Sequence, residues 1–385
     1  MSAGVWREVV GQPAAVAELS TAASTPSAMT HAWLFTGPPG SGRSNAARAF
    51  AAALQCPGGG CGECQACHTV LARTHADVRE VVPEGLSISV AEMRNLVQLA
   101  ARRPSTGAWQ ILIITDADRL TEGAANALLK AVEEPADQTV FLLCAPSDHP
   151  DDVPVTIRSR CRVVALRTPA PEAIAEVLVE RDGIEPEQAR WAASVSGGHV
   201  GRARRLARDA EARERRERVL GVPLRLRHLG DAFAFADDLV RFAEAEAADV
   251  SGARDAAERE ELAVAMGAGG TGKGVAAAAR GAKAAERELE RRQKSRNTRT
   301  QRDALDRALI DLAGFYRDVL VAGAAATVAL GNPDRESDIR QAAREWSPES
   351  TLRRLEAVLA CREALELNVK PRIAVEAMMT ALQQG

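Results

Sequence analysis

Short apolar runs recur along the first 170 residues, separated by longer stretches of mixed polarity. The runs are rich in Val, Ile, Leu and Phe, and Gly, Pro, Asp or Thr bound most of them. Apolar runs of this length without alternation are typical of strands that are buried on both faces. The sequence therefore predicts strands at residues 31–36, 78–82, 110–115, 139–144 and 163–166.

The stretches between these runs carry apolar residues at helical spacing, and the sequence predicts helices at 45–53, 90–103 and 124–134. Strands that alternate with helices favour a parallel, doubly wound sheet. Ligands bind such sheets at the carboxyl ends of the strands. The first 170 residues are therefore predicted to form an α/β domain with a ligand site at one edge of its sheet.

The rest of the chain has a helical pattern. Residues 170–215 are strongly basic, and residues 229–332 contain almost no proline, which favours a helical bundle. The predicted fold class is α/β followed by all-α. The predicted domains are 1–168, 169–218 and 219–385, with a charged helical insertion around 251–300.

A glycine-rich loop, Gly37-Pro-Pro-Gly40-Ser-Gly42-Arg43-Ser44, joins the first predicted strand to the first predicted helix. This is the setting of a phosphate-binding loop, in which backbone N–H groups and a helix N-terminus face an anion. The pattern requires lysine where Arg43 stands, and a planar guanidinium does not fill the space of an ammonium group. The loop therefore predicts phosphate binding with impaired catalysis.

Only five of the 49 basic residues are lysines. Because the whole chain favours arginine over lysine, arginine at position 43 is weaker evidence of a special role at that position. Asp116 follows the third predicted strand, where a nucleotide-binding sheet holds its magnesium carboxylate. The next residue is Ala117, where a glutamate would orient the attacking water.

Four closely spaced cysteines follow the first predicted helix: Cys56, Cys61, Cys64 and Cys67. Two overlapping Cys-x-x-Cys pairs with a fourth thiol upstream form the ligand set of a closed, structural zinc site. Separately buried thiols are one alternative. An iron–sulfur cluster is another, although its usual bacterial run has different spacing and a following proline. The nearby histidines, His68 and His75, are interpreted as surface residues.

Neither a signal peptide nor a membrane-spanning run is recognisable, which favours a cytoplasmic protein whose seven cysteines are ligands or buried thiols. The formal net charge of −3 argues against a globally basic nucleic-acid binder. Two basic stretches, 202–218 and 286–302, either contact phosphates or form solvated helix faces with paired charges.

A second glycine-rich stretch, Gly267–Gly274, imitates the phosphate loop. It has Gly274 where magnesium requires a hydroxyl, and no buried strand precedes it. We interpret it as a turn in a charged helical hairpin.

Three further motifs carry a family resemblance: Asn126-Ala-Leu-Leu-Lys130, Glu133-Glu-Pro135 and Ser159-Arg160-Cys161. Together with the cysteine insertion they resemble the clamp-loader branch of the AAA+ ATPases, in its bacterial members. The resemblance covers residues 5–210. Beyond that it rests on Leu367–Glu376, which is similar to a run in the family's C-terminal collar domain.

The resemblance implies a AAA+ domain with a zinc knuckle at 56–67, a small helical lid and a helical collar. It makes Arg160 an arginine finger that acts in trans on ATP held by a neighbouring subunit, a task that suits a permanently charged planar group. It also places a degenerate site for ATP or ADP with Mg²⁺ at Val10, Gly37, Gly40, Gly42, Arg43, Ser44 and Asp116.

Three departures from active members of the family fall in that nucleotide site. They are Arg43, Ala117 and Gly201, the last standing where the lid motif at 196–204 would carry a sensing arginine. All three remove groups that serve hydrolysis. We expect weak or absent ATP hydrolysis by this chain.

The implied function is that of a clamp-loader subunit in a cytoplasmic, nucleoid-associated hetero-oligomer. Its partners would be tau/gamma-type ATPases, a delta subunit, a sliding clamp and primed DNA, with no membrane. The sequence has no acidic pair arranged for polymerase chemistry. Two alternatives are an active ATPase motor subunit of the same complex and a zinc-dependent DNA-binding module with a vestigial nucleotide site. The anionic net charge and the lack of a groove-reading helix argue against the latter.

Overall fold

The computed structural model of the chain describes residues 4–83, 85–265 and 275–385. The stretch Gly267–Gly274, interpreted above as a turn, lies outside the described residues. The chain divides into two compact units, Met1–Arg208 and Asp209–Gly385, and each is described by itself.

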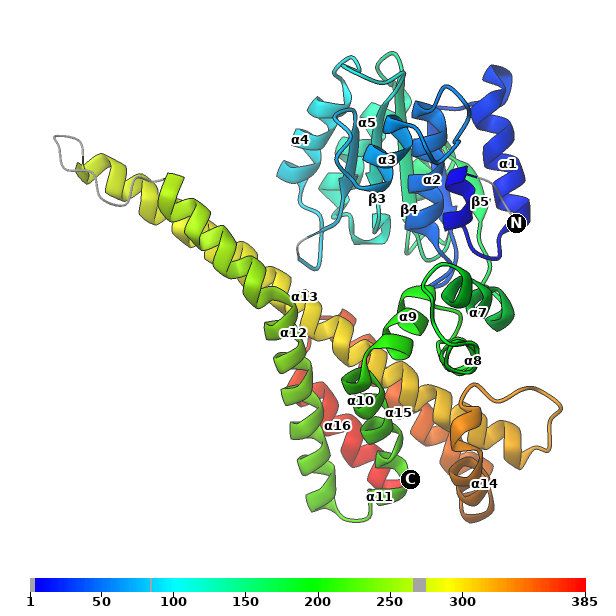
Figure 1. Cartoon of the computed structure of the whole chain (residues 1–385). Helices are drawn as coiled ribbons and strands as arrows, with labels where there is room; N and C mark the ends of the chain where they lie inside the picture. Colours follow the sequence, from blue (N-terminus) through cyan, green and yellow to red (C-terminus); the bar gives the residue numbers. More distant parts are fainter. Residues whose placement is uncertain (1–3, 84, 266–274) are drawn as a thin grey trace. The chain divides into compact units, whose positions relative to one another are not determined.

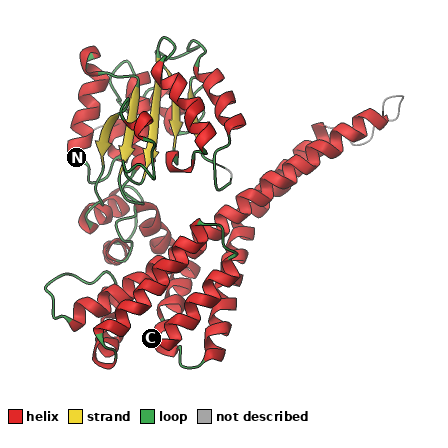
Figure 2. Cartoon of the chain, turned by 180° about the vertical axis from the view of Figure 1, so that it is seen from behind, coloured by secondary structure: helices red, strands yellow, loops and turns green. Residues whose placement is uncertain are grey.

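A five-stranded sheet forms the centre of the first unit, and Figure 2 shows helices on both of its faces. All its strand pairs are parallel and their order is β2-β3-β4-β1-β5, so the predicted doubly wound sheet is confirmed. The strands lie close to their predicted positions: β1 (Ala32–Thr36), β2 (Val78–Val81), β3 (Gln110–Ile114), β4 (Thr139–Ala145) and β5 (Arg162–Ala165).

Alternate residues of each strand enter two separate cores, because successive side chains of a strand point to opposite faces. Trp33 and Phe35 face α2 (Arg43–Gln55), where Trp33 packs edge-on against Phe50 with ring centroids 5.0 Å apart. Leu34 faces the opposite core, which α4 (Val90–Ala100) and α5 (Glu122–Glu133) cover. The buried face of α2 is mostly alanine, which lets this helix lie close to the sheet.

The remaining elements of the first unit are short. Helices α7, α8 and α9 pack on one another after the last strand, at the place predicted for a lid. The bounds are η1 (Gly4–Glu8), α1 (Pro13–Ser24), η2 (Pro26–Ala28), α3 (Gln65–Leu71), η3 (Ala117–Arg119), α6 (Val155–Arg158), α7 (Pro171–Glu180), α8 (Pro186–Ser194) and α9 (Val200–Arg208).

The second unit is helical throughout its described elements, which confirms the predicted change of fold class (Figure 1). It has one apolar core, to which its long helices α12 and α13 contribute. The bounds are α10 (Ala210–Leu220), α11 (Val222–Arg225), α12 (Leu229–Ala265), α13 (Val275–Gly323), η4 (Pro333–Arg335), α14 (Glu336–Glu345), α15 (Pro348–Glu366) and α16 (Pro371–Gln384).

Helix α10 belongs with the second unit. Its Arg216 is buried and donates to Asp334 at 2.6 Å and to Asn332 at 2.7 Å. The domain ranges 1–168, 169–218 and 219–385 remain predictions, and the compact units divide between residues 208 and 209.

The described residues of the predicted insertion around 251–300 belong to α12 and α13, which lie side by side (Figure 1). Polar side chains cross between them: Arg296 contacts Asp255 at 2.5 Å and Glu258 at 2.6 Å. This pairing with Arg296 lowers the pKa of Glu258 to about 2. Within the described residues, no helix has the length and apolar character that crossing a bilayer requires.

Candidate nucleotide and metal sites

The phosphate-loop sequence forms the turn between β1 and α2. Gly37, Gly40 and Gly42 have φ angles of 152°, 88° and 91°, a region that glycine adopts without a Cβ penalty. Gly42 caps α2, so Arg43 and Ser44 are the first two residues of the helix. The glycine pattern therefore serves the turn that a phosphate-binding loop requires.

Arg43 is turned toward its own loop. Its Nη1 donates to the carbonyl oxygen of Gly37 at 2.6 Å. Burial raises the pKa of Asp118, with Asp116 adding to the rise and the charges of Arg119 and Arg43 opposing it. Arg43 and Asp116 both act on Asp118, so all three lie near the same edge of the sheet, where the sequence predicts the first two.

The carboxylate predicted to hold magnesium, Asp116, is half-buried two residues beyond the end of β3. Ala117 follows it as a buried methyl group, with 1% of its surface exposed. No side chain at position 117 can orient a water molecule.

The lid lies directly on the phosphate loop within the first unit. A Cβ atom added to Gly40 would lie 2.7 Å from both Cα and Cβ of His199. Gly201, in the first turn of α9, lies next to the His199 ring and has no side chain that could reach a phosphate. The lid motif was predictable from sequence, but the contact between His199 and Gly40 was not.

Gln12 forms hydrogen bonds that connect the N-terminal segment to the phosphate loop and to the segment after β5. Its Nε2 donates to the carbonyl of Arg167 at 2.5 Å and to that of Ser41 at 3.3 Å, and its Oε1 accepts from the Arg167 N–H at 3.1 Å. Val10, predicted to contact nucleotide, is half-buried in the preceding turn. A lone glutamine gives no sequence signal for this role.

The Ser159-Arg160-Cys161 segment links α6 to β5. Arg160 contacts Glu133 of α5 at 2.6 Å and donates to the carbonyl of Thr156 at 2.8 Å, and 40% of its side chain is exposed. Two of the motifs quoted above therefore meet in one ion pair. Burial raises the pKa of Cys161 to about 12, so this thiol stays protonated.

The two neighbouring arginines have other partners. Arg158 pairs with Asp148 at 2.6 Å. Arg162 pairs with Glu18 at 2.7 Å, and its guanidinium lies 5.0 Å from the centroid of the Trp33 ring.

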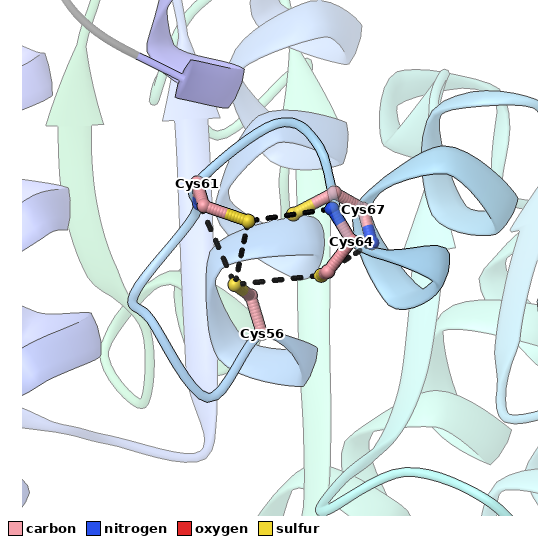
Figure 3. A group of neighbouring side chains, drawn as sticks. All are labelled: Cys56, Cys61, Cys64 and Cys67. Atoms are coloured by element: carbon pink, nitrogen blue, oxygen red, sulfur yellow. Dashed lines mark hydrogen bonds between the residues drawn. The ribbon is translucent and has the colours of Figure 1, made fainter.

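The four predicted cysteines converge just beyond the end of α2 (Figure 3). All four sulfur atoms lie within 4.8 Å of one another, and Sγ of Cys56 lies 3.6 Å from that of Cys61 and 3.7 Å from that of Cys64. Zn–S bonds of about 2.3 Å in a tetrahedron place sulfur atoms about 3.8 Å apart. The cluster therefore fits a tetrahedral metal ion.

Backbone N–H groups surround the sulfur atoms. Gly58 and Cys61 donate to Sγ of Cys56 at 3.3 and 3.4 Å, and Gly62 donates to Sγ of Cys67 at 3.4 Å. Burial opposes ionisation of Cys56, but the N–H groups of Cys61, Gly60 and Gly58 lower its pKa to about 6. Such outer donors orient thiolate ligands and stabilise their charge.

Burial raises the pKa of Cys67, where the Gly62 donor only partly compensates. A metal ion must displace that proton to gain the fourth thiolate. His68 and His75 are not among the clustered ligands of the described chain.

Two buried polar residues that sequence inspection missed hold the loop before β3. Asp77 accepts hydrogen bonds from both the N–H and the hydroxyl of Ser105 and Thr106, and from the Gly107 N–H, at 2.7 to 2.8 Å. Burial opposes ionisation of Asp77, but these donors hold its pKa well below the usual range. Gln55 accepts from the N–H of Ala108 at 2.9 Å and donates to the carbonyl of Trp109 at 2.6 Å.

Comparison with known proteins gives a family match that lies within the first unit. Residues 11–170 match the family model described as DNA polymerase III, delta subunit. The chain is 34% identical over 214 residues to the DNA polymerase III subunit delta' of Bacillus subtilis, covering 54% of this chain and 64% of the relative. It is 36% identical over 199 residues to the subunit delta' of Pseudomonas aeruginosa, covering 50% and 60%.

The DNA polymerase III subunit tau of Bacillus subtilis is 34% identical over a shorter span of 161 residues, covering 41% of this chain and 28% of that relative. The chain spans less than two thirds of the length of each delta' relative named here. The parallel sheet, the phosphate-loop turn and the clustered cysteines all lie within residues 11–170, the part that matches the family model. Over about half of its length, the chain is therefore similar to the delta-prime subunits of bacterial DNA polymerase III.

Proposed function

We propose that the chain is the delta-prime-type subunit of a bacterial clamp loader. In that role it supplies Arg160 in trans to ATP bound by a neighbouring tau/gamma-type ATPase subunit. With a delta subunit it helps those ATPases to open a sliding clamp and place it on primed DNA. The proposal extends the names of the relatives to the whole of this chain.

The contrast between Arg43 and Arg160 carries the proposal. Arg43, which would serve the chain's own nucleotide, donates to its own loop at 2.6 Å. Arg160 is exposed to solvent, and among the described residues its side-chain partners are the carboxylate of Glu133 and acceptors on its own segment. Exposed ion pairs of this kind are worth about 0–1 kcal/mol, so a triphosphate can replace Glu133 at little cost.

The nucleotide site of the chain itself is proposed to bind ATP or ADP weakly and to hydrolyse ATP slowly or not at all. The residues that would line it are Val10, Gly37, Gly40, Gly42, Arg43, Ser44 and Asp116. Three features support this: the inward-turned Arg43, the methyl group of Ala117 and the missing side chain at Gly201.

Zinc is the proposed occupant of the four-cysteine cluster, because the sulfur spacing suits a tetrahedral ion of its size. With all four positions filled by protein, zinc would stabilise the fold without taking part in catalysis. Cys56, Cys61, Cys64 and Cys67 would be its ligands.

The test is reconstitution with tau/gamma-type and delta subunits, followed by measurement of assembly and of DNA-stimulated ATPase activity. Arg160→Ala should leave assembly intact and abolish turnover at the site it serves, since an arginine finger is worth about 10³–10⁵ in rate. Arg158→Ala is the matched control, because Arg158 is also exposed and paired with a carboxylate at 2.6 Å. Unchanged turnover in an intact Arg160→Ala complex would contradict the proposal.

The same preparations separate the two alternative functions. Substantial ATP turnover by the isolated chain, lost in Arg43→Ala, would identify an active motor subunit. Tight binding to duplex DNA without partner subunits would identify a DNA-binding module.

A further inference from the structure

An apolar groove opens in the second unit between α10–α11 and α12. Its volume is about 260 Å³, and its floor reaches the core of the unit. Pockets for drug-sized ligands measure about 300–1,000 Å³, so this groove suits one or two side chains of a polypeptide. The apolar floor consists of Val219, Val222, Leu239, Leu312 and Met379.

Two arginines stand at the mouth of the groove, each against an aromatic ring. The guanidinium of Arg218 lies 5.0 Å from the ring centroid of Phe242, and that of Arg225 lies 5.5 Å from the ring centroid of Phe235. All four side chains line the groove. Stacking on a ring restricts a guanidinium group while leaving its edge free to donate hydrogen bonds.

The charges at the mouth are not balanced. Arg218 pairs with Glu214 at 2.5 Å, and Asp238, the acidic residue that lines the groove, pairs with Arg241. Arg225 donates only to main-chain carbonyls, those of Gly221 at 3.1 Å and Arg218 at 3.2 Å. Within the described chain no carboxylate neutralises Arg225, and the pair of Arg218 with Glu214 is exposed and therefore weak.

We infer that this groove binds a short segment of a partner protein in which a large aliphatic side chain lies beside an acidic residue. The aliphatic side chain fills the floor, and the carboxylate pairs with Arg225 and, on exchange with Glu214, with Arg218. Basic segments are disfavoured by the same arginines. The inference does not depend on the proposed clamp-loader function, because neither Arg160 nor the phosphate loop takes part in it.

The test is selection of short peptides from a random phage-displayed library on the full-length chain, followed by measurement of their affinity by fluorescence anisotropy. The enriched peptides should combine Leu, Ile or Met with Asp or Glu, and Arg225→Glu should weaken their binding at least tenfold. Arg340→Glu is the matched control, because Arg340 is an exposed arginine of α14 outside the groove, paired with Glu336, and its replacement should leave affinity within twofold. Circular dichroism establishes that each variant is folded.

A charge exchange completes the test. Replacing the acidic residue of an enriched peptide with lysine should abolish binding to the native chain and restore it to the Arg225→Glu variant. The inference is overturned if the enriched peptides are basic, if none is recovered, or if Arg225→Glu and Arg340→Glu affect binding equally.

Discussion

The two ends of α2 carry two predicted ligand sites that differ in how complete their ligand groups are. At its N-terminal end the phosphate loop keeps its glycine turns, while Arg43 is turned to the loop's own carbonyl and His199 lies on Gly40. Just beyond its C-terminal end, four thiols stand at the spacing that a tetrahedral ion requires. The comparison teaches that the turn of a phosphate loop depends on its glycines and not on a lysine at position 43, whereas a metal knuckle depends on its complete ligand set.

The largest effect is expected at the C-terminal end of α2, on removal of the metal. Structural zinc sites contribute about 10 kcal/mol or more of binding free energy to folding. Cys67→Ser should therefore lose zinc, measured by atomic absorption, and lower the melting temperature markedly. Cys361→Ser is the control, a buried thiol in the second unit that should cost only about 1 kcal/mol. Equal destabilisation by the two substitutions would contradict a structural metal.

A smaller loss is expected at Gln55, the last residue of α2. Gln55→Ala leaves the N–H groups of Ala108 and Trp109 and the carbonyl of Trp109 without their partner. We expect it to lower the free energy of unfolding by about 2–3 kcal/mol, measured by urea denaturation. Gln98→Ala, on the exposed face of α4, should stay within about 0.5 kcal/mol. A neutral Gln55→Ala would show that water replaces these bonds.

At the phosphate-loop end, Gly40→Ala tests the contact between loop and lid. Alanine at φ 88° is strained, and its Cβ would lie 2.7 Å from His199. We expect a loss of about 1–3 kcal/mol in thermal or urea unfolding. Gly42→Ala is the matched control, because Gly42 has φ 91° but no atom within 4 Å of an added Cβ. Equal losses of unfolding free energy in the two variants would mean that backbone strain alone destabilises them and that His199 moves away from the added Cβ at no cost.

The smallest effect is expected from Arg43→Lys, which restores the residue of active phosphate loops. Stability should change by less than about 0.5 kcal/mol, because Arg43 is half-buried and bonds a single carbonyl. ATP turnover should remain absent, since Ala117 and Gly201 still lack the groups that serve hydrolysis. Turnover approaching about 1 s⁻¹, the lower range for phosphoryl transfer, would show that Arg43 alone silences the site.

The sequence predicted the strands and the four thiols because each leaves a local pattern: a buried strand is a short apolar run, and a knuckle is a set of spaced cysteines. It did not predict Gln55, Asp77 or Gln12, because a buried polar residue is identified only by the distant backbone groups it satisfies. Gln12 and Arg167 are separated by 155 positions in the chain. The contact between Gly40 and His199 was missed for the same reason, although both residues lie in recognised motifs.

The ion pair between Arg160 and Glu133 has a consequence for the chain before it assembles. An unpaired, exposed guanidinium would attract any phosphate in solution, including free nucleotide and nucleic acid. Glu133 gives it a local counter-ion at 2.6 Å, and the exposure of both partners keeps that hold weak. Glu133 thus neutralises the proposed arginine finger before assembly without preventing its function. On assembly beside a bound triphosphate, the phosphate replaces the Glu133 carboxylate as the partner of Arg160.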